Sequence, residues 1–332
     1  MQTQNTNTLT SGVVINKSTG LYTISHGEDS VICRLSPKLW KDFDAMTFPE
    51  GKQRDGLAVN NKQIDPVVIG DRVTYTLADH GQGIIVDIAP RRNHLARRAA
   101  KPMPSAHAFE QVIAANLDQV IPIFAAAEPP PKWPMLDRYL VAAESCGIPS
   151  IIVITKFDLI KGHRAETELL AVIQRYQEIG YPIILTSAIS GQGLEDLRQV
   201  MADKTSALVG KSGVGKSTLL NMLEPGLGIR VQAVNPTTGK GRHTTTNLEM
   251  FTLANGGAII DTPGTREFGI WGLNPGEIAD YFPEMRPLLG QCRFGLSCQH
   301  DQEPGCAIRK AVMDGQISPY RYKSYLRMKA DL

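Results

Sequence analysis

The sequence predicts a multidomain chain with a small β-barrel, a doubly wound α/β domain and a helical C-terminal module. Three observations support this organisation. Short β-rich runs separated by turn signals fill residues 30–89, which is typical of a small barrel. Continuous apolar runs then alternate with amphipathic helical patterns, as in a parallel sheet covered by helices on both faces. Finally, three cysteines and a histidine gather within residues 292–306.

The composition is that of an ordinary globular protein. The chain has 332 residues, of which 42% are hydrophobic and 20% charged, which suits two or three domains with their own cores. Lys and Arg number 35 against 33 Asp and Glu, so net charge alone does not indicate a nucleic-acid binder. No apolar stretch approaches the ~20 residues of a membrane span, and the polar N-terminus lacks the features of a signal peptide. We therefore expect a cytoplasmic monomer that contacts no membrane.

The N-terminal third is expected to hold a flexible segment followed by the barrel. Residues 1–29 start with a polar stretch rich in Thr and Asn, and we expect them to be flexible. Residues 30–104 contain the β-rich runs, whose spacing suggests an OB-fold, and then a basic stretch from Arg91 to Lys101 that has no acid. Prolines after this stretch mark a linker. The β-rich runs are Val31–Leu35, Pro66–Ile69, Arg72–Leu77 and Ile84–Ile88.

The pattern of apolar residues changes in residues 105–283 and predicts the α/β domain. Their short runs are apolar on both faces, as expected of strands buried between two helix layers. Helical patterns with one apolar face lie between them, for example around Leu136 and Leu169. The apolar runs are Val120–Phe124, Ile151–Ile154, Ile183–Leu185, Ala207–Val209 and Ala258–Ile260.

The strongest single motif follows the apolar run that ends at Val209. It fits the pattern G-x-x-x-x-G-K-[ST], a phosphate-binding loop between a strand and a helix. Its glycines let backbone N–H groups wrap around phosphates, and the helix N-terminus adds a favourable dipole. Lys216 should reach the β- and γ-phosphates and assist catalysis, and Ser217 should bind Mg²⁺. The loop comprises Gly210, Lys211, Ser212, Gly213, Val214, Gly215, Lys216, Ser217 and Thr218.

Two downstream motifs predict contacts to Mg²⁺ and to a γ-phosphate. Asp261 ends an apolar run and opens a D-x-x-G motif, in which Asp261 would hold the Mg²⁺ shell and the Gly264 N–H would sense the γ-phosphate. Between the two motifs lies the polar stretch Gly241–Thr246, in which we favour Thr245 as a switch residue that closes over Mg²⁺. An ordinary turn for the first motif and a solvated loop of threonines for the second remain alternatives.

The nucleotide base would be selected by a loop upstream of these motifs. Thr155-Lys156-Phe157-Asp158 follows an apolar run and resembles the guanine-reading N-K-x-D motif. Asp158 would accept hydrogen bonds from guanine N1 and N2, which adenine cannot donate. Lys156 would pack its stem along the base. Thr155 stands where this motif usually has Asn.

A second base-reading loop, Thr186-Ser187-Ala188, follows the next strand, and backbone N–H groups of Ser187 and Ala188 would support guanine O6. Both loops precede the phosphate-binding loop, whereas common GTPases place them after it. A circular permutation explains this order, because parallel-sheet domains often have termini that lie close together. The sequence therefore predicts a circularly permuted P-loop domain that binds GTP, or its product GDP, with Mg²⁺.

The residue that positions the attacking water is the least defined part of this site. Many GTPases carry a Gln after D-x-x-G, but this sequence has Thr265 and then Arg266. His243 in the Thr-rich stretch could position water instead, or it could be structural. We expect slow intrinsic GTP hydrolysis that a partner accelerates.

Residues 284–332 contain the Cys and His cluster and a basic tail. Three thiolates and one imidazole suit tetrahedral Zn²⁺, and four protein ligands leave no open position, so we expect a structural site rather than a catalytic one. A reduced cysteine cluster without metal is the alternative. The expected ligands are Cys292, Cys298, His300 and Cys306.

Basic and aromatic residues suggest that the chain binds RNA. Basic side chains supply phosphate affinity, and tyrosines can stack on unpaired bases. A solvated helix face is the alternative for the C-terminal tail. Besides the stretch from Arg91 to Lys101, the residues concerned are Arg309, Lys310, Arg321, Lys323, Arg327 and Lys329, with Tyr320, Tyr322 and Tyr325.

Taken together, these motifs resemble the ribosome small-subunit-dependent GTPase A family of circularly permuted GTPases, from about Ser30 onward. The resemblance implies an N-terminal OB-fold, a central permuted GTPase and a C-terminal zinc domain. It also implies that the 30S ribosomal subunit with its 16S rRNA is the partner and stimulates hydrolysis during late maturation. The matching segments are Gly70–Val73, Arg91–Arg98, Asn116-x-Asp118, Gly210–Thr218, Gly241–Thr245, Asp261–Gly264 and Glu303–Cys306.

We therefore expect a GTPase that acts as a late assembly factor of the small ribosomal subunit. Two alternatives belong to other classes. The first is a passive RNA-binding protein with a regulatory or degenerate nucleotide site, which would show no turnover stimulated by 30S subunits. The second is a P-loop ATPase, for which ATP would compete for the site as well as GDP does.

Overall fold

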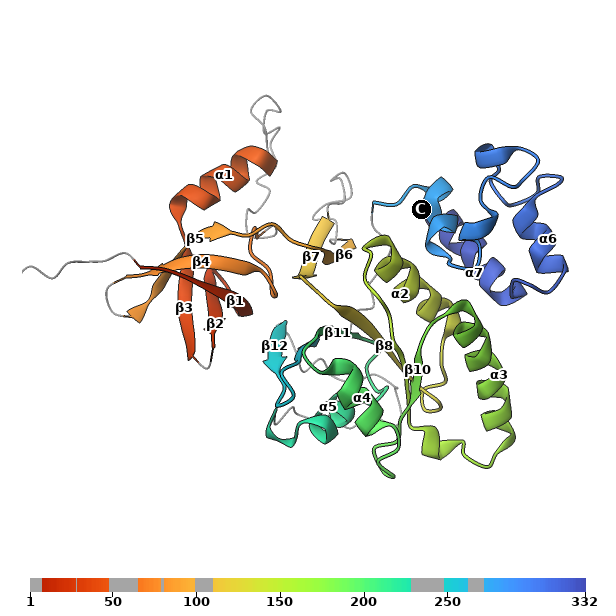
Figure 1. Cartoon of the computed structure of the whole chain (residues 1–332), viewed down its shortest axis with the longest axis horizontal. Helices are drawn as coiled ribbons and strands as arrows, with labels where there is room; N and C mark the ends of the chain where they lie inside the picture. The colour runs from red at the N-terminus through yellow and green to blue at the C-terminus, as the bar shows by residue number, and fades with distance from the viewer. Residues whose placement is uncertain are drawn as a thin grey trace, which may run out of the picture.

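The computed structural model describes residues 8–27, 29–47, 65–78, 81–98, 110–227, 248–261 and 272–332. It confirms the predicted architecture of an N-terminal barrel, a central α/β domain and a helical C-terminal domain (Figure 1). Within these ranges, no helix combines the length and the apolarity of a membrane span. His243, Thr245 and Gly264 lie outside the described residues.

The barrel is closed by pairing between its first and fourth strands. The strands follow the order β1-β2-β3-β5-β4, and β4 pairs with β1. β3 and β5 are parallel, and α1 connects β3 to the segment before β4, which is the arrangement of an OB-fold. Val14, Tyr22, Tyr75 and Ile85 fill the interior. The bounds are β1 Leu9–Ser18, β2 Leu21–His26, β3 Asp29–Leu35, α1 Pro37–Thr47, β4 Arg72–Leu77 and β5 Gly83–Ile88.

The structure corrects the expectation that residues 1–29 form a flexible segment. β1 and β2 lie within this range and pair with each other as part of the barrel. Val14, Tyr22 and Ile24 are buried in its core. The polar composition was misleading because only one face of each strand in a small barrel is buried, so Thr, Asn and Ser occupy the outward positions.

The α/β domain is built on a sheet with the strand order β10-β9-β8-β11-β13-β12. Neighbouring strands are parallel except for β12, which runs antiparallel to β13. The chain fills one side of β8 first and then the other, so the order of winding reverses between β8 and β11. The bounds are β8 Gln119–Ala125, β9 Ile152–Thr155, β10 Ile183–Leu185, β11 Thr205–Val209, β12 Glu249–Thr252 and β13 Ala258–Asp261.

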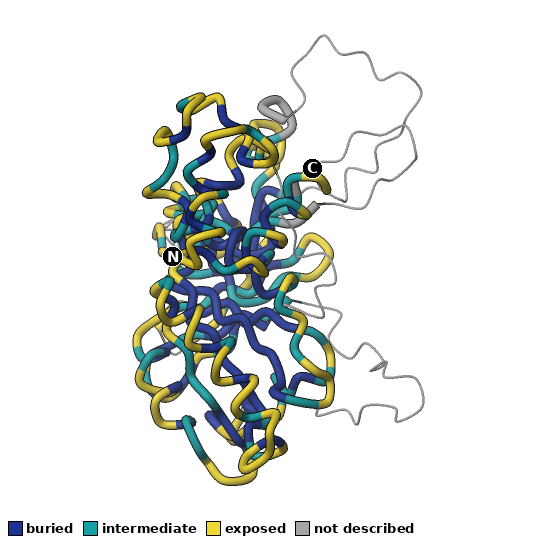
Figure 2. Tube along the Cα trace, turned by 90° about the vertical axis from the view of Figure 1, so that its right-hand side faces the viewer, coloured by how far each residue is buried: buried dark blue, intermediate teal, exposed yellow. Residues whose placement is uncertain are grey.

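Helices cover both faces of this sheet, because alternate side chains of each strand point to opposite faces. Along β8, Val120 and Phe124 pack with α2 and α3, whereas Ile121 and Ile123 pack with α4 and α5. The buried segments accordingly run through the middle of the molecule, between exposed outer segments (Figure 2). The bounds are α2 Trp133–Ser145, α3 Arg164–Ile179, α4 Leu194–Met201 and α5 Lys216–Leu223.

A short hairpin links the barrel to the α/β domain. β6 (His94–Arg98) pairs with β7 (Glu110–Ala115), and the chain then enters β8. Asn116 bridges the two parts, because its side chain accepts from the Arg92 N–H at 2.9 Å and donates to the Gly70 carbonyl at 2.9 Å. The hairpin therefore spans the expected boundary between residues 104 and 105.

Two arginines of the predicted basic stretch form ion pairs at this junction. Arg91 donates to both carboxylate oxygens of Asp71, at 2.7 and 2.8 Å, and Asp71 is fully buried. Arg92 pairs with Asp118 at 2.7 Å. The fully buried Asp71 therefore holds Arg91 at the junction rather than on the expected RNA-binding surface, whereas Arg92 stays exposed. A sequence shows the positive charges but not the acidic partners that lie many residues away.

The C-terminal domain begins earlier than the expected residue 284. Ile278 and Phe282 lie before that point, yet they share a core with Ile308 and Tyr325. Tyr325, expected on an RNA-binding surface, is buried in this core because it packs edge-to-face on Phe282. The bounds are η4 Pro275–Tyr281, η5 Arg286–Leu288, η6 Gly295–Ser297, α6 Ala307–Met313 and α7 Pro319–Ala330.

A buried ion network joins this domain to the α/β domain. Arg321 of α7 donates to Asp137 of α2 at 2.6 Å and to Glu284 at 2.7 and 3.1 Å. Its guanidinium also lies 4.5 Å from the centroid of the Phe282 ring. Arg321 is only 3% exposed, so its expected role in an RNA-binding surface was wrong as well.

Replacing Arg321 with Ala should destabilise the protein by about 3–5 kcal/mol, because two buried carboxylates would lose their counter-charge. Urea unfolding, followed by circular dichroism, measures this change. Arg327→Ala is the matched control, since Arg327 is exposed on the same helix and should change stability by less than about 0.5 kcal/mol. Equal stabilities of the two variants would contradict the role assigned to the network.

Candidate nucleotide site and metal centre

The phosphate-binding motif forms a tight loop between β11 and α5. Gly213 and Gly215 adopt φ angles of +86° and +92°, a region that favours glycine. A Cβ atom at Gly210 would lie 2.5 Å from the Ile123 carbonyl oxygen of the neighbouring strand. Glycine at these positions therefore allows the backbone to turn beside β8 and to start α5 at Lys216.

Lys216 points back across this loop. Its Nζ donates to the Gly210 carbonyl at 2.8 Å, so the side chain spans the loop from end to start. Burial lowers the pKa of Lys216, and the Asp261 carboxylate opposes this shift. A cation positioned by a backbone carbonyl and near a carboxylate could bind a phosphate anion.

Asp261 ends β13 and lies beside the start of the loop, because β11 pairs with β13. The residue is 6% exposed, and its Oδ1 atom has no hydrogen-bond partner among the described residues. Burial raises the pKa of Asp261, and Lys216 lowers it. An unpartnered buried carboxylate oxygen is costly, and a hydrated divalent cation would satisfy it. Asp261 and Ser217, the second residue of α5, could thus hold Mg²⁺.

Thr155 connects the expected base-reading loop to the phosphate loop. It is the last residue of β9, and its hydroxyl donates to the Val214 carbonyl inside the phosphate loop and lies 3.3 Å from the Phe124 carbonyl. The Thr155 hydroxyl therefore tethers the two loops, at the position where this motif usually has Asn. Val214 itself packs into the core between the sheet and α5.

Lys156 and Asp158 follow on a tight turn. Lys156 has a φ of +55°, and its Nζ donates to the Glu128 carbonyl. Asp158 lies half-buried in the short 3₁₀ helix η2 (Phe157–Leu159). The Glu128 contact could not be found from sequence, although the proline run after Glu128 marks a loop at that point.

The second base-reading loop packs against the first. The Phe157 N–H donates to the Thr186 carbonyl at 3.1 Å, and the Thr186 N–H donates to Ile154 at 2.7 Å. Ser187 turns the chain, because its hydroxyl accepts from the Ser190 N–H at 3.2 Å. Ala188 follows in the same turn, half-buried. The structure thus brings together the two loops that were predicted to read the base, as expected if they form one site.

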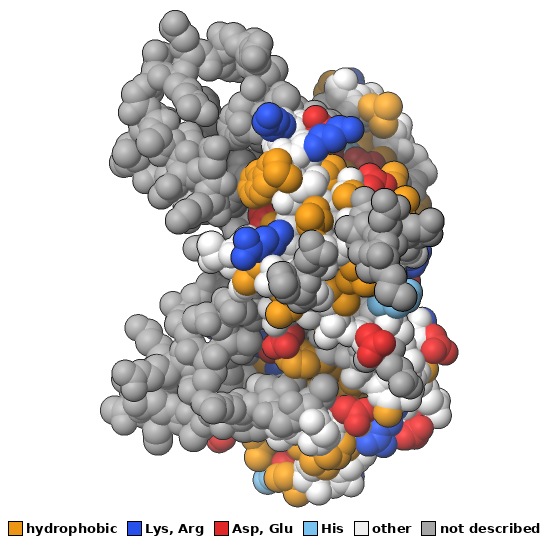
Figure 3. All heavy atoms as spheres, turned by 90° about the vertical axis from the view of Figure 1, so that its left-hand side faces the viewer, with side chains coloured by type: hydrophobic (Ala, Val, Ile, Leu, Met, Phe, Trp, Pro, Cys, Tyr) orange, Lys and Arg blue, Asp and Glu red, His pale blue; other side chains and the backbone are white. Residues whose placement is uncertain are grey.

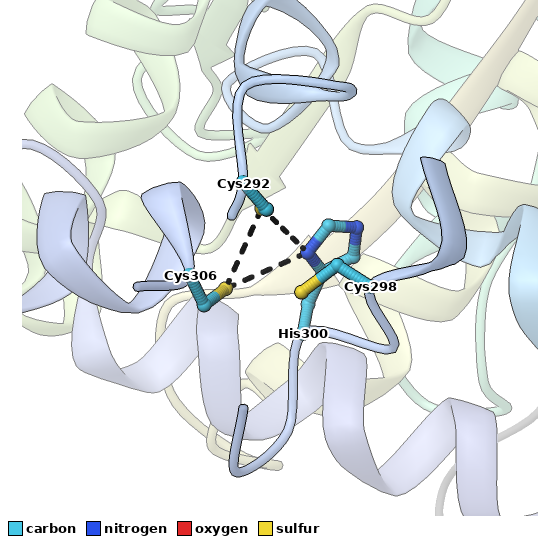
Figure 4. Close-up of side chains that lie close together, drawn as sticks. All are labelled: Cys292, Cys298, His300 and Cys306. Carbon is cyan, nitrogen blue, oxygen red and sulfur yellow. Dashed lines mark hydrogen bonds between the residues drawn. The ribbon is translucent and has the colours of Figure 1, made fainter. Parts of the chain in front are cut away.

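The four residues expected to bind zinc form a buried cluster (Figure 4). Their ligand atoms all lie within 4.8 Å of one another. His300 Nδ1 is 3.4 Å from Cys292 Sγ and 3.5 Å from Cys306 Sγ, and the two sulfurs are 3.9 Å apart. Cys298 completes the group from the end of η6. The four side chains could therefore hold one metal ion.

Backbone hydrogen bonds shape the cluster. The Ala307 N–H points at Cys292 Sγ at 3.3 Å, and the Arg309 N–H points at Cys306 Sγ at 3.5 Å. Cys306 thereby caps the N-terminus of α6, and backbone N–H groups are directed at two of the four sulfur and nitrogen positions of the cluster.

Glu303 organises the loop that carries His300, a role that was not predicted from the sequence. Its carboxylate accepts from the N–H groups of Gln299, Asp301 and Gln302 at 2.8–3.1 Å. Hydrogen bonds from backbone N–H groups, of which the N–H of Glu303 itself contributes most, lower the pKa of Glu303 to about 2. The only sequence signal was the E-P-G-C segment in which this residue lies.

Replacing Thr155 with Val should weaken GDP binding roughly 3- to 10-fold, because a lost hydroxyl bond costs about 0.5–1.5 kcal/mol and frees the phosphate loop. Isothermal titration calorimetry with GDP and Mg²⁺ measures this change. Thr155→Ser keeps the hydroxyl and should bind GDP nearly as the parent does. A Val variant with unchanged affinity would show that the tether does not support nucleotide binding.

Comparison with known proteins agrees with the architecture. A family model described as RsgA GTPase matches residues 88–271. Over 268 residues the chain is 47% identical to the small ribosomal subunit biogenesis GTPase RsgA of Gemmatimonas aurantiaca, covering 80% of this chain and 84% of that protein. It is 42% identical to the protein of that name from Azotobacter vinelandii, over 80% of this chain and 75% of the relative.

Two solved structures share the fold over nearly the whole chain. The crystal structure of YjeQ from Thermotoga maritima aligns with a TM-score of 0.73 and 28% identity, covering 98% of this chain and 99% of that one. The structure of YloQ, described as a circularly permuted GTPase, aligns with a TM-score of 0.67 and 26% identity, covering 100% and 97%. The chain belongs to the RsgA family of circularly permuted GTPases.

Proposed function

We propose that this chain is a GTPase of small ribosomal subunit biogenesis, which binds the 30S subunit and its 16S rRNA late in maturation and hydrolyses GTP there. The observation that carries the GTPase part is that Thr155 links the first base-reading loop to the phosphate loop, while Phe157 of the same loop bonds to Thr186 of the second. The names of the relatives support the ribosomal part. In this proposal the chain acts as a monomer in the cytoplasm.

Guanine recognition is assigned to the two loops at the ends of β9 and β10. Asp158 accepts from guanine N1 and N2, Lys156 covers the base, and backbone N–H groups of Ser187 and Ala188 meet O6. Adenine offers an acceptor where guanine offers N1–H, so a buried carboxylate would be left unpaired with ATP. Thr155 does not replace the Asn contact to guanine, but its hydroxyl holds the loop in register.

Phosphate and Mg²⁺ binding are assigned to the start of α5 and to β13. Backbone N–H groups of the loop from Gly210 to Thr218 wrap around the phosphates, and Lys216 exchanges the Gly210 carbonyl for phosphate oxygens. Bound Mg²⁺ neutralises charge that develops on the phosphates. Ser217, Asp261 and Thr245 hold it, and the Gly264 N–H senses the γ-phosphate.

Hydrolysis depends on a water molecule in line with the γ-phosphate. Thr265 stands where a Gln is common, so we assign the positioning of water to His243 of the Thr-rich stretch. Because Thr265 lacks the amide side chain of Gln, intrinsic turnover is slow in this proposal and the subunit supplies the acceleration.

The metal of the C-terminal cluster is assigned as one structural zinc ion. Zn–S bonds of about 2.3 Å and Zn–N bonds of about 2.0–2.1 Å give tetrahedral edges of roughly 3.8 Å between sulfurs and 3.6 Å between sulfur and nitrogen. The separations of 3.9, 3.4 and 3.5 Å match this geometry. Four protein ligands leave no position for substrate, so the ion stabilises the domain.

The barrel supplies a surface suited to RNA. Ile32, Ile84 and Val86 point outward from neighbouring strands and are 52%, 38% and 37% exposed. Arg34 and Arg72 are exposed on the same barrel. Apolar and basic side chains lie side by side on this side of the molecule (Figure 3). Such a mixture supports backbone charge neutralisation together with contacts to bases.

GTP hydrolysis by the purified protein should rise at least about tenfold when 30S subunits are added, because the chain lacks the usual water-positioning Gln. Phosphate release, measured with GTP and with ATP, tests this. ATP turnover should stay at background. Equal slow rates with and without subunits would reject the activation by 30S and favour the passive RNA-binding alternative.

The matched control in the same assay is Asp158→Asn tested with GTP and xanthosine triphosphate. Xanthine carries a second carbonyl where guanine has its amino group, so the Asn variant should lose GTP turnover and gain xanthosine triphosphate turnover. Loss of both activities would point to misfolding, and no change would reject the base-reading role.

Chelation should remove one zinc ion per chain and unfold the C-terminal domain while GDP binding persists, because a structural zinc contributes folding free energy to its own domain. Metal analysis by mass spectrometry and limited proteolysis measure the two effects. Cys298→Ala should lose the metal, and Cys146→Ala, outside the cluster, should keep it. Metal retained after replacement of both Cys298 and His300 would contradict the assignment.

A further inference from the structure

A cavity of about 660 Å³ lies between the α/β domain and the C-terminal domain, away from the nucleotide loops. Its walls come from α2, α3 and α7, which lie close together in Figure 1. This volume falls within the roughly 300–1,000 Å³ of ordinary small-ligand sites. None of the motifs assigned to GTP, Mg²⁺ or zinc contributes to its walls.

The floor of the cavity is apolar and aromatic. Trp133 and Tyr176 lie with ring centroids 5.9 Å apart and an interplanar angle of 33°, and Val172 and Ile179 extend this surface along α3. Trp133 is half-buried, so part of its ring faces the opening. An apolar, aromatic surface of this kind suits a planar ring system.

The rim is basic. Arg175, Lys323 and Arg327 line the opening and are exposed. Arg321 also lines the cavity, but its charge is neutralised by Asp137 and Glu284. The remaining acid of the lining, Glu168, is paired with Arg164 outside the cavity at 2.9 Å. The rim therefore favours an anionic ligand.

An exposed aromatic ring stands beside this rim. Tyr320 is 75% exposed at the start of α7, and the Arg175 guanidinium lies 5.8 Å from the centroid of its ring. Large exposed aromatic rings beside cations are common stacking platforms for unpaired bases. The ring contributes little to the core, so stability does not explain its position.

We propose that this cavity binds an unpaired nucleotide of an RNA strand. The base stacks on Tyr320 or enters against Trp133, and the flanking phosphates meet Arg175, Lys323 and Arg327. A paired base inside a duplex has no free face to offer the floor, so recognition is restricted to single-stranded or flipped-out nucleotides. The proposal goes beyond the GTPase function and rests on it only in that RNA is the partner.

Crosslinking tests the proposal at the cavity itself. The probe is a ten-nucleotide RNA of alternating adenosine and cytidine with one central 4-thiouridine, irradiated with the full-length protein and mapped by mass spectrometry. Crosslinked peptides containing Trp133 or Tyr320 are expected. The same strand annealed to its complement should not crosslink there. Crosslinks confined to the barrel would overturn the proposal.

Two pairs of variants measure the contributions of stacking and charge. Tyr320→Ala should reduce the crosslink at Trp133 by about 5- to 100-fold, as expected for a lost stacking partner, and Phe294→Ala is the control because Phe294 is also exposed in this domain. Lys323→Glu should reduce the crosslink and its salt dependence, and Lys310→Glu is the control with the same charge change. Equal effects of the cavity variant and its control within each pair would reject nucleotide binding at the cavity.

A photoreactive benzoylphenylalanine placed at Tyr320, irradiated with 30S subunits, identifies the class of partner. A crosslink to 16S rRNA supports the proposal, and a crosslink to a ribosomal protein overturns it. Basal GTP hydrolysis, which uses none of these residues, should be unchanged in all variants. If 30S subunits do not stimulate the parent but the cavity still crosslinks RNA, the proposed function fails while the cavity assignment stands.

Discussion

The carboxyl ends of the parallel strands meet at one edge of the central sheet, and the arrangement of the nucleotide loops depends on this constraint. β8, β9, β10, β11 and β13 all point in the same direction. The loops that follow β9, β10 and β11, together with Asp261 at the end of β13, must therefore lie on the same side. In open α/β sheets, ligands bind at this edge, where the order of winding reverses. The reversal between β8 and β11 lies directly beside the phosphate loop.

The constraint concerns strand positions and not their order along the chain, which is why a circular permutation leaves the site intact. A hydrogen-bonded contact across the permuted halves shows this directly. Thr155 comes from the half that precedes the phosphate loop, and its hydroxyl reaches the Val214 carbonyl in the other half, 59 residues away. The permutation also changes where the chain leads after β13. The residues after β13 enter the C-terminal domain, whose core includes Val141 of α2.

Features that depend on residues close together in the sequence could be predicted, whereas contacts between residues far apart in the sequence could not. The apolar runs, the phosphate loop and the Cys and His cluster are local signals, and the structure has the expected strands and cluster at those positions. β1 and β2 were missed because their outward faces are polar. Arg91 and Arg321 were assigned to a surface because their acidic partners lie 20 and 184 residues away. The cavity joins three helices from distant segments, so no local pattern marks it.

The strand order of the barrel has one more consequence. The two sheets are continuous, since β1 of the barrel pairs with β12, the last strand of the α/β domain, through Asn16 and Glu249. An uncovered strand edge offers unpaired backbone groups to other chains and promotes aggregation. At the other end, β10 spans only Ile183–Leu185, a length that limits such pairing. The barrel thus covers the first residue of β12, and an α/β domain separated from it would leave the backbone of Glu249 unpaired at this edge.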